Sequence, residues 1–149
     1  MSTRERAPGT VSAEDAAAVL EANRAFYAAL ETRDAARMEA LWSHGDDVAC
    51  VHPGWHRLDG WEEILRSWRA IFANSRAWKV RPEEDRAFVS DDVAVVLCIE
   101  VLEASGGAGD PARMQATNVF RRENGEWRMV HHHASAVPEA GEQEEETIN

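Results

Sequence analysis

The chain has 149 residues, a hydrophobic share of 44% and a formal net charge of −11 at pH 7. This length suits one domain with a buried core, and the acidic charge argues against electrostatic binding to nucleic acid. No apolar run reaches the ~18 residues of a membrane helix, and the N-terminus lacks the apolar core of a signal peptide. We therefore expect a cytoplasmic protein with no nucleic-acid or membrane partner.

Composition separates the two ends from the middle of the chain. Residues 1–11 are predicted to be disordered, and residues 138–149 carry five glutamates and no basic residue, as in an acidic disordered tail. The folded domain is expected over 12–137. Its two cysteines, Cys50 and Cys98, form no C-x-x-C motif and are predicted to be buried, reduced thiols.

The first predicted element is a helix over 12–32, which Ser12 can cap. Its apolar stripe includes Phe26 and Tyr27, and Asn23 lies inside that stripe. A buried amide needs a hydrogen-bond partner, so Asn23 is a candidate pocket donor. The alternative is an asparagine at the edge of the stripe that bonds to backbone or water.

A shorter helix is predicted over 34–42, ending at Trp42, and an alternating strand over 48–52. Within that strand His52 shares a face with Cys50, so the pattern permits His52 to point inward. Trp55 follows the turn and could line the mouth of a pocket or anchor the loop. A third helix is predicted to be capped by Asp59, with Trp68 on its core line.

From residue 78 onward the pattern predicts strands over 78–90, 93–104, 113–123 and 126–137. The strand over 93–104 is nearly continuously apolar, which predicts burial on both faces. Asn124-Gly125 is typical of a two-residue type I′ hairpin turn. Helices followed by a long antiparallel sheet indicate the α+β class.

The last strand carries three consecutive histidines, His131, His132 and His133. Strict alternation places His131 and His133 on the face of Met129, and His132 on the other face. Either face could line a pocket. A metal site would need His52 and other histidines to converge with one face of this triplet, and no helical ligand spacing supports it, so we predict no metal.

Three segments together resemble the nuclear transport factor 2-like superfamily, in particular its SnoaL-like branch. They are AFYAALETRDAARMEALWSHGDDVACVHPGW, GWEEILRSW and VFRRENGEWRMVHHHAS. The V-H-x-H-x-S pattern within the last also resembles the association domain of calcium/calmodulin-dependent kinase II. The resemblance covers about residues 11–137. It implies a cone of three N-terminal helices on a curved, mainly antiparallel sheet, with an apolar pocket and a sheet-mediated homodimer.

In the ketosteroid isomerases of this superfamily, an aspartate before proline is the general base. His52-Pro53 stands at the matching position, and histidine suits proton transfer near neutral pH. The family's tyrosine corresponds to Phe26, and its oxyanion-binding acid falls near Asn118, whose amide could donate to an oxyanion. Losing both groups argues against steroid-type isomerisation. The same alignment favours His132 at the pocket.

The resemblance implies a protein that holds a small hydrophobic or carbonyl-containing molecule without a cofactor. It would be an isomerase, lyase or cyclase with His52 and Asn118 as catalytic residues, or alternatively a non-catalytic ligand-binding or homo-oligomerisation domain. The predicted pocket residues are Asn23, Phe26, Tyr27, Trp42, Trp55, Trp68, His131, His132 and His133.

Overall fold

The computed structural model describes residues 12–104, 106 and 109–138. The predicted disordered segment 1–11 and residues 139–149 of the acidic tail lie outside these ranges. The helices are α1 (Ala13–Thr32), α2 (Ala35–Leu41) and α3 (Trp61–Asn74). The strands are β1 (Ala49–Val51), β2 (Leu58–Asp59), β3 (Trp78–Ser90), β4 (Val93–Ala104), β5 (Ala112–Glu123) and β6 (Glu126–Ala136).

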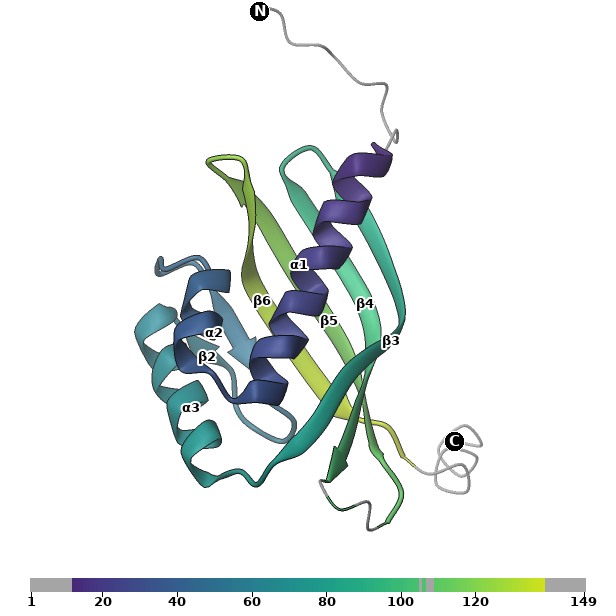
Figure 1. Ribbon diagram of the computed structural model, residues 1–149. Helices are drawn as coiled ribbons and strands as arrows, with labels where there is room; N and C mark the ends of the chain where they lie inside the picture. Colours follow the sequence, from purple (N-terminus) through teal and green to yellow (C-terminus); the bar gives the residue numbers. More distant parts are fainter. Residues whose placement is uncertain (1–11, 105, 107–108, 139–149) are drawn as a thin grey trace, which may run out of the picture.

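The strands form one six-stranded sheet in the order β2-β1-β6-β5-β4-β3. All neighbours are antiparallel except β1 and β6, which run parallel with Cys50 opposite His132. The sheet curves around α1, while α2 and α3 cover the end formed by β1 and β2 (Figure 1). The predicted α+β architecture is thus confirmed, and the parallel pair brings the residue after β1 beside the histidines of β6.

Local side-chain chemistry sets where the helices begin. Ser12 and Asp34 cap α1 and α2, each accepting a backbone N–H from three residues further on. The third helix differs from its prediction, because Gly60 rather than Asp59 is the capping residue. Gly60 has φ of +87°, a conformation that glycine adopts without steric cost, and Asp59 belongs to β2 instead.

The closing hairpin has the predicted turn and one feature that the sequence pattern missed. Asn124 and Gly125 have φ of 53° and 81°, as a type I′ turn requires. Further along, Phe120 pairs with Met129 and Val119 pairs with His131, so Val130 is an extra residue in β6. This β-bulge breaks the alternation. Met129 therefore shares the buried face with His132, and its predicted grouping with His131 and His133 was wrong.

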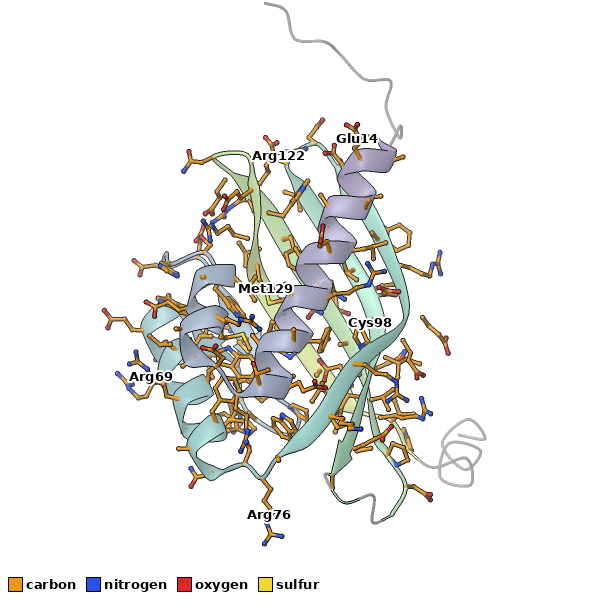
Figure 2. All side chains as sticks on the ribbon, viewed as in Figure 1. Glu14, Arg69, Arg76, Cys98, Arg122 and Met129 are labelled. Atoms are coloured by element: carbon orange, nitrogen blue, oxygen red, sulfur yellow. The ribbon has the colours of Figure 1, made fainter. Side chains whose placement is uncertain are left out.

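The core fills the space between the helices and the inner face of the sheet. Figure 2 shows Cys98 of β4 and Met129 of β6 on the side that α1 covers. On β4 this inner face is buried, whereas the outer face is mixed: Val93 and Leu97 are 45% and 37% exposed, and Val101 is fully buried. The predicted burial of β4 on both faces is thus wrong at Val93 and Leu97 in the single chain, where apolar side chains are left exposed on the outer face.

Candidate functional site

A cavity of about 220 Å³ lies between the end of α1, helix α3 and the inner face of the sheet. Three buried polar residues face it from different strands or strand ends, and the remaining lining is apolar or aromatic. The lining residues are Leu30, His52, Pro53, Trp55, Trp68, Ile71, Trp78, Glu100, Leu102, Met114 and His132. Drug-sized ligands occupy pockets of ~300–1,000 Å³, so this cavity suits a more compact molecule.

Hydrogen bonds around Asn118 determine the tautomer of His132. The Asn118 amide donates from Nδ2 to Oδ1 of Asn23 (2.8 Å) and to the hydroxyl of Tyr27 (3.1 Å). Its Oδ1 must then be the acceptor for Nδ1 of His132, 2.6 Å away. Since an uncharged imidazole carries one proton, we assign that proton to Nδ1 and the free lone pair to Nε2.

The lone pair of His132 lies near a buried acid on β4. Nε2 is 3.6 Å from Oε2 of Glu100, and the same oxygen accepts a hydrogen bond from the Tyr27 hydroxyl at 2.7 Å. Burial raises the pKa of Glu100 to about 7, although the bond from Tyr27 opposes the rise. Burial also lowers the pKa of His132 to about 3. Near neutral pH the imidazole is therefore neutral, and the carboxyl is partly protonated.

A contact with the third helix likewise determines the tautomer of His52. Its Nε2 lies 2.9 Å from the hydroxyl of Ser67, and that hydroxyl donates to the carbonyl of Ile64 at 2.6 Å. The only proton of the hydroxyl is thus used, so His52 donates from Nε2 and Nδ1 is its basic nitrogen. Burial lowers the pKa of His52 to about 4. Its ring lies 6.4 Å from that of His132.

The aromatic residues form walls around these groups. The ring of Trp68 is 4.6 Å from His52 and 6.0 Å from His132. Phe26 packs against His132 at 4.8 Å. Trp55 packs edge-on to His52 at 4.7 Å and is 45% exposed, so it forms the rim between the cavity and solvent.

The predicted catalytic and pocket residues fall into three groups. Four line the cavity (His52, Trp55, Trp68 and His132), and four lie behind His132 or pack against it (Asn23, Phe26, Tyr27 and Asn118). The remaining three are removed from it. Trp42 packs against Trp61 in the core, whereas His131 and His133 stand on the opposite face of β6 because of the bulge.

Glu100 was missed by the sequence predictions, although the structure places it in the lining of the cavity. The available signal was a carboxylate, one of two with Glu103, inside the apolar run Val93–Ala104. An acid at such a position is either buried and partnered or marks an exposed face. Only the contact with Tyr27 of α1 shows that Glu100 is the buried and partnered kind.

Other kinds of site find no support in the described part of the chain. No helix there is long and apolar enough to cross a membrane, and no cluster of three or more His, Cys, Asp or Glu could hold a metal ion. Cys50 and Cys98 are free and buried, as predicted. Burial raises the pKa of both thiols, which keeps them protonated and poorly nucleophilic.

The SnoaL-like domain family matches residues 19–139, and the chain belongs to this family. The F-box protein SKIP8 of Arabidopsis thaliana is 30% identical over 120 residues. That match covers 80% of this chain and 50% of SKIP8, so the chain spans about half the length of this relative.

Two solved structures are similar in both sequence and fold. A candidate dehydratase from the NTF2-like family of Streptomyces avermitilis is 37% identical, with a TM-score of 0.77 over 84% of this chain and 97% of that one. A candidate calcium/calmodulin-dependent protein kinase type II association domain from Thiobacillus denitrificans is 36% identical, with a TM-score of 0.73 over 78% and 93%. The predicted resemblance is thus confirmed, and the fold is that of a small-molecule-binding domain family.

Proposed function

We propose that this protein is a cofactor-independent enzyme that transfers protons on a small carbonyl compound, as a lyase, isomerase or cyclase. One observation carries the proposal: two neutral imidazoles and a partly protonated carboxyl group lie together in a small apolar cavity. Such groups, held apart in pKa by their surroundings, are typical of paired acid and base residues.

His52 is the proposed general base. Removal of a proton beside a carbonyl is the common first step of an allylic isomerisation, a β-elimination and an aldol cyclisation. The Ser67 contact holds the proton of His52 on Nε2, so Nδ1, which lies 3.9 Å from the Cys50 thiol, is the nitrogen that would accept a proton. Because burial keeps the ring neutral at pH 7, the base is in its active form.

Glu100 is the proposed general acid, with His132 beside it. In a dehydration, His52 would take the α-proton, the C–O bond at the β-carbon would break, and Glu100 would protonate the departing hydroxide. One C=C bond forms, one water leaves, and the proton on His52 returns to Glu100 through solvent. The description of the 37%-identical relative as a candidate dehydratase supports the lyase among the three reactions.

Asn118 takes a different role in this proposal from the one expected from the resemblance. Its amide protons already serve Asn23 and Tyr27, and its oxygen holds His132. It is therefore proposed as a positioning residue that fixes the His132 tautomer, and not as a donor to an oxyanion.

The test uses β-hydroxy ketones such as 3-hydroxycyclohexanone in D₂O, with NMR detection of α-deuteration and of the enone product. Wild-type protein should accelerate both processes. His52→Ala should lower the rate by ~10²–10⁴-fold, the usual contribution of a general base. His56→Ala is the matched control, because His56 is exposed four residues away and should leave the rate unchanged. A His52→Ala variant as fast as wild type would contradict the assignment.

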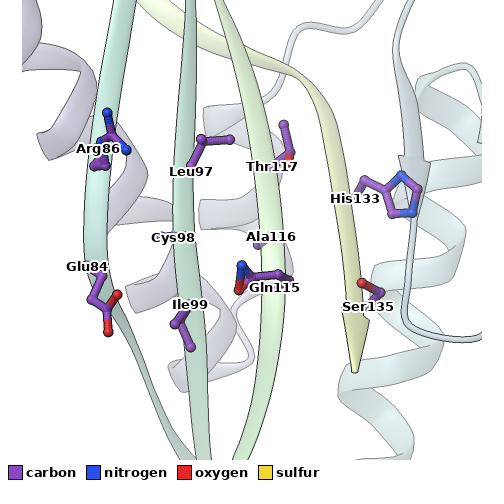
Figure 3. A pocket seen from close by; sticks show the side chains of 10 residues that line it. All are labelled: Glu84, Arg86, Leu97, Cys98, Ile99, Gln115, Ala116, Thr117, His133 and Ser135. Atoms are coloured by element: carbon purple, nitrogen blue, oxygen red, sulfur yellow. The ribbon is translucent and has the colours of Figure 1, made fainter. Parts of the chain in front are cut away.

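The alternative proposal is a homo-oligomerisation domain, favoured by the outer face of the sheet. Phe88, Val93 and Leu97 leave apolar side chains exposed there. Leu97 also lines a hollow of about 450 Å³ on the face away from α1, where Figure 3 shows it with Ile99 and polar neighbours. The 36%-identical relative, described as a candidate association domain, agrees with this use.

Light scattering after gel filtration tests whether this face forms a homodimer. Wild type should have twice the monomer mass of 16.6 kDa. Leu97→Lys should give monomers because it places a charge among these exposed apolar side chains. Ala70→Lys, on an exposed position of α3, is the control and should remain dimeric. A dimeric Leu97→Lys or a monomeric wild type would contradict the proposed interface. Dimerisation and catalysis are compatible, so only the D₂O experiment decides about the reaction.

A further inference from the structure

One oxygen of the buried acid in the cavity has no partner within the protein. Glu100 lines the cavity and is 3% exposed, and its Oε2 accepts the hydrogen bond from Tyr27. No group in the described part of the chain donates to its other oxygen, Oε1. This oxygen is also not one of the fully buried side-chain atoms there that lack a partner, so it keeps accessible surface. For an enclosed residue of the lining, that surface faces the cavity.

Both imidazoles of the lining use their only N–H within the protein. His52 donates to Ser67 at 2.9 Å, and His132 donates to Asn118 at 2.6 Å. The unprotonated Nε2 of His132 lies 3.6 Å from Oε2 of Glu100, which is too far for a hydrogen bond. These residues therefore offer the cavity a carboxylate oxygen and an imidazole lone pair, and the matching ligand group is a donor.

The charges around the cavity favour a donor that is a cation. None of the described lining residues is a lysine or arginine, and Glu100 is the only acid among them. Trp55, Trp68 and Trp78 also line the cavity, and indole is the aromatic ring that binds cations best. The formal net charge of −11 raises the local concentration of cations. A primary ammonium group, with three N–H donors and no acceptor, matches these features.

We propose that the cavity binds a compact primary ammonium ion, which donates one N–H to Oε1 of Glu100 and another to Nε2 of His132. Hydrogen bonds between ionised partners are the strong ones, and they offset the cost of burying both charges. This ligand is distinct from the carbonyl compound of the proposed function. It would exclude that compound from the cavity, and it would hold Glu100 in its ionised form.

Isothermal titration calorimetry of the full chain at about pH 8 tests this proposal. The probes are cyclohexylammonium, cyclohexanol and cyclohexanecarboxylate, which share one ring and differ in charge. Cyclohexylammonium should bind at least about tenfold more tightly than cyclohexanol, and the carboxylate should not bind. In protein with ¹⁵N-labelled histidine, cyclohexylammonium should shift the Nε2 signal of His132 and leave that of the exposed His56 in place.

Two glutamine variants separate the buried carboxylate from the general acidity of the chain. Glu100→Gln keeps the size of the side chain but cannot ionise, and it should bind cyclohexylammonium about 30-fold more weakly or worse. Glu103→Gln is the matched control, because it makes the same change of charge three residues along β4. Glu103 pairs with Arg81 at 2.7 Å, and its replacement should leave the affinity unchanged.

Several results would overturn the proposal. Cyclohexanol or the carboxylate could bind as tightly as cyclohexylammonium, or cyclohexylammonium could fail to bind. An unmoved His132 signal, an unchanged affinity in Glu100→Gln, or an equal loss in Glu103→Gln would place the cation on the acidic surface instead. These measurements need no turnover, so their outcome is separate from the effect of His52→Ala on α-deuteration.

Discussion

Replacing Glu100 by glutamine should remove a loss of stability that the protein carries at neutral pH. Glutamine keeps the size of the side chain and an oxygen that can accept the 2.7 Å bond from Tyr27, but it cannot ionise. In the wild type, burial raises the pKa of Glu100 from 4.5 to about 7. The carboxylate is thus less favourable in the folded state than in the unfolded state.

The sign and size of the effect follow from proton linkage. Between pH 4.5 and about pH 7 the folded chain retains a proton on Glu100 that the unfolded chain has lost, so stability falls as the pH rises. At about 1.4 kcal/mol per pH unit, the loss is roughly 3 kcal/mol once both states are ionised. His52 and His132, whose pKa values are lowered from 6.5, act in the opposite direction, losing stability as the pH falls below that value. They are present in both proteins, so the comparison isolates Glu100.

Urea unfolding of both proteins, between about pH 4.5 and about pH 8, measures this difference. The free energy of unfolding of Glu100→Gln minus that of wild type should increase by roughly 3 kcal/mol from the low to the high end of this pH range. Glu21→Gln is the control, because Glu21 is exposed on α1. The free energy of unfolding of this variant should change with pH as that of wild type does. A difference between Glu100→Gln and wild type that does not change with pH would refute the buried, raised state of this acid.

Three further substitutions probe the network, the core and the turn. Asn118→Leu should cost about 3 kcal/mol in urea unfolding because it strands buried polar partners. It should also change the imidazole ¹⁵N spectrum of His132, and an unchanged spectrum would contradict the proposal that Asn118 fixes the His132 tautomer. Ile64→Ala, at a fully buried site, should cost about 2–5 kcal/mol by the same measurement, and less than 1 kcal/mol would mean the core is loose there. Gly125→Ala should cost about 1 kcal/mol in thermal unfolding because φ is +81°, and no loss would contradict the turn geometry.

The elements that depend on short-range chemistry could be predicted from the sequence. Ser12 and Asp34 mark the helix starts because their side chains satisfy backbone N–H groups nearby. Asn124-Gly125 identifies the hairpin because both residues accept positive φ. In the same way His52, two residues after Cys50, was predicted to be able to point inward, and it is buried.

The chemical character of the candidate site depends on contacts between distant segments. The bulge at Val130 decides which histidine of β6 faces inward, and it exists only through the pairing with β5. Glu100 becomes an acid with a pKa of about 7 only because the curved sheet buries it against Tyr27, 73 residues away. The sequence alone therefore determined where most helices and strands lie, which family the chain resembles, and that His52 could point inward. The tertiary structure brought His52, Glu100 and His132 into one cavity, because strand pairing places their distant segments side by side. Burial and hydrogen bonding across the sheet then set the protonation of the three groups.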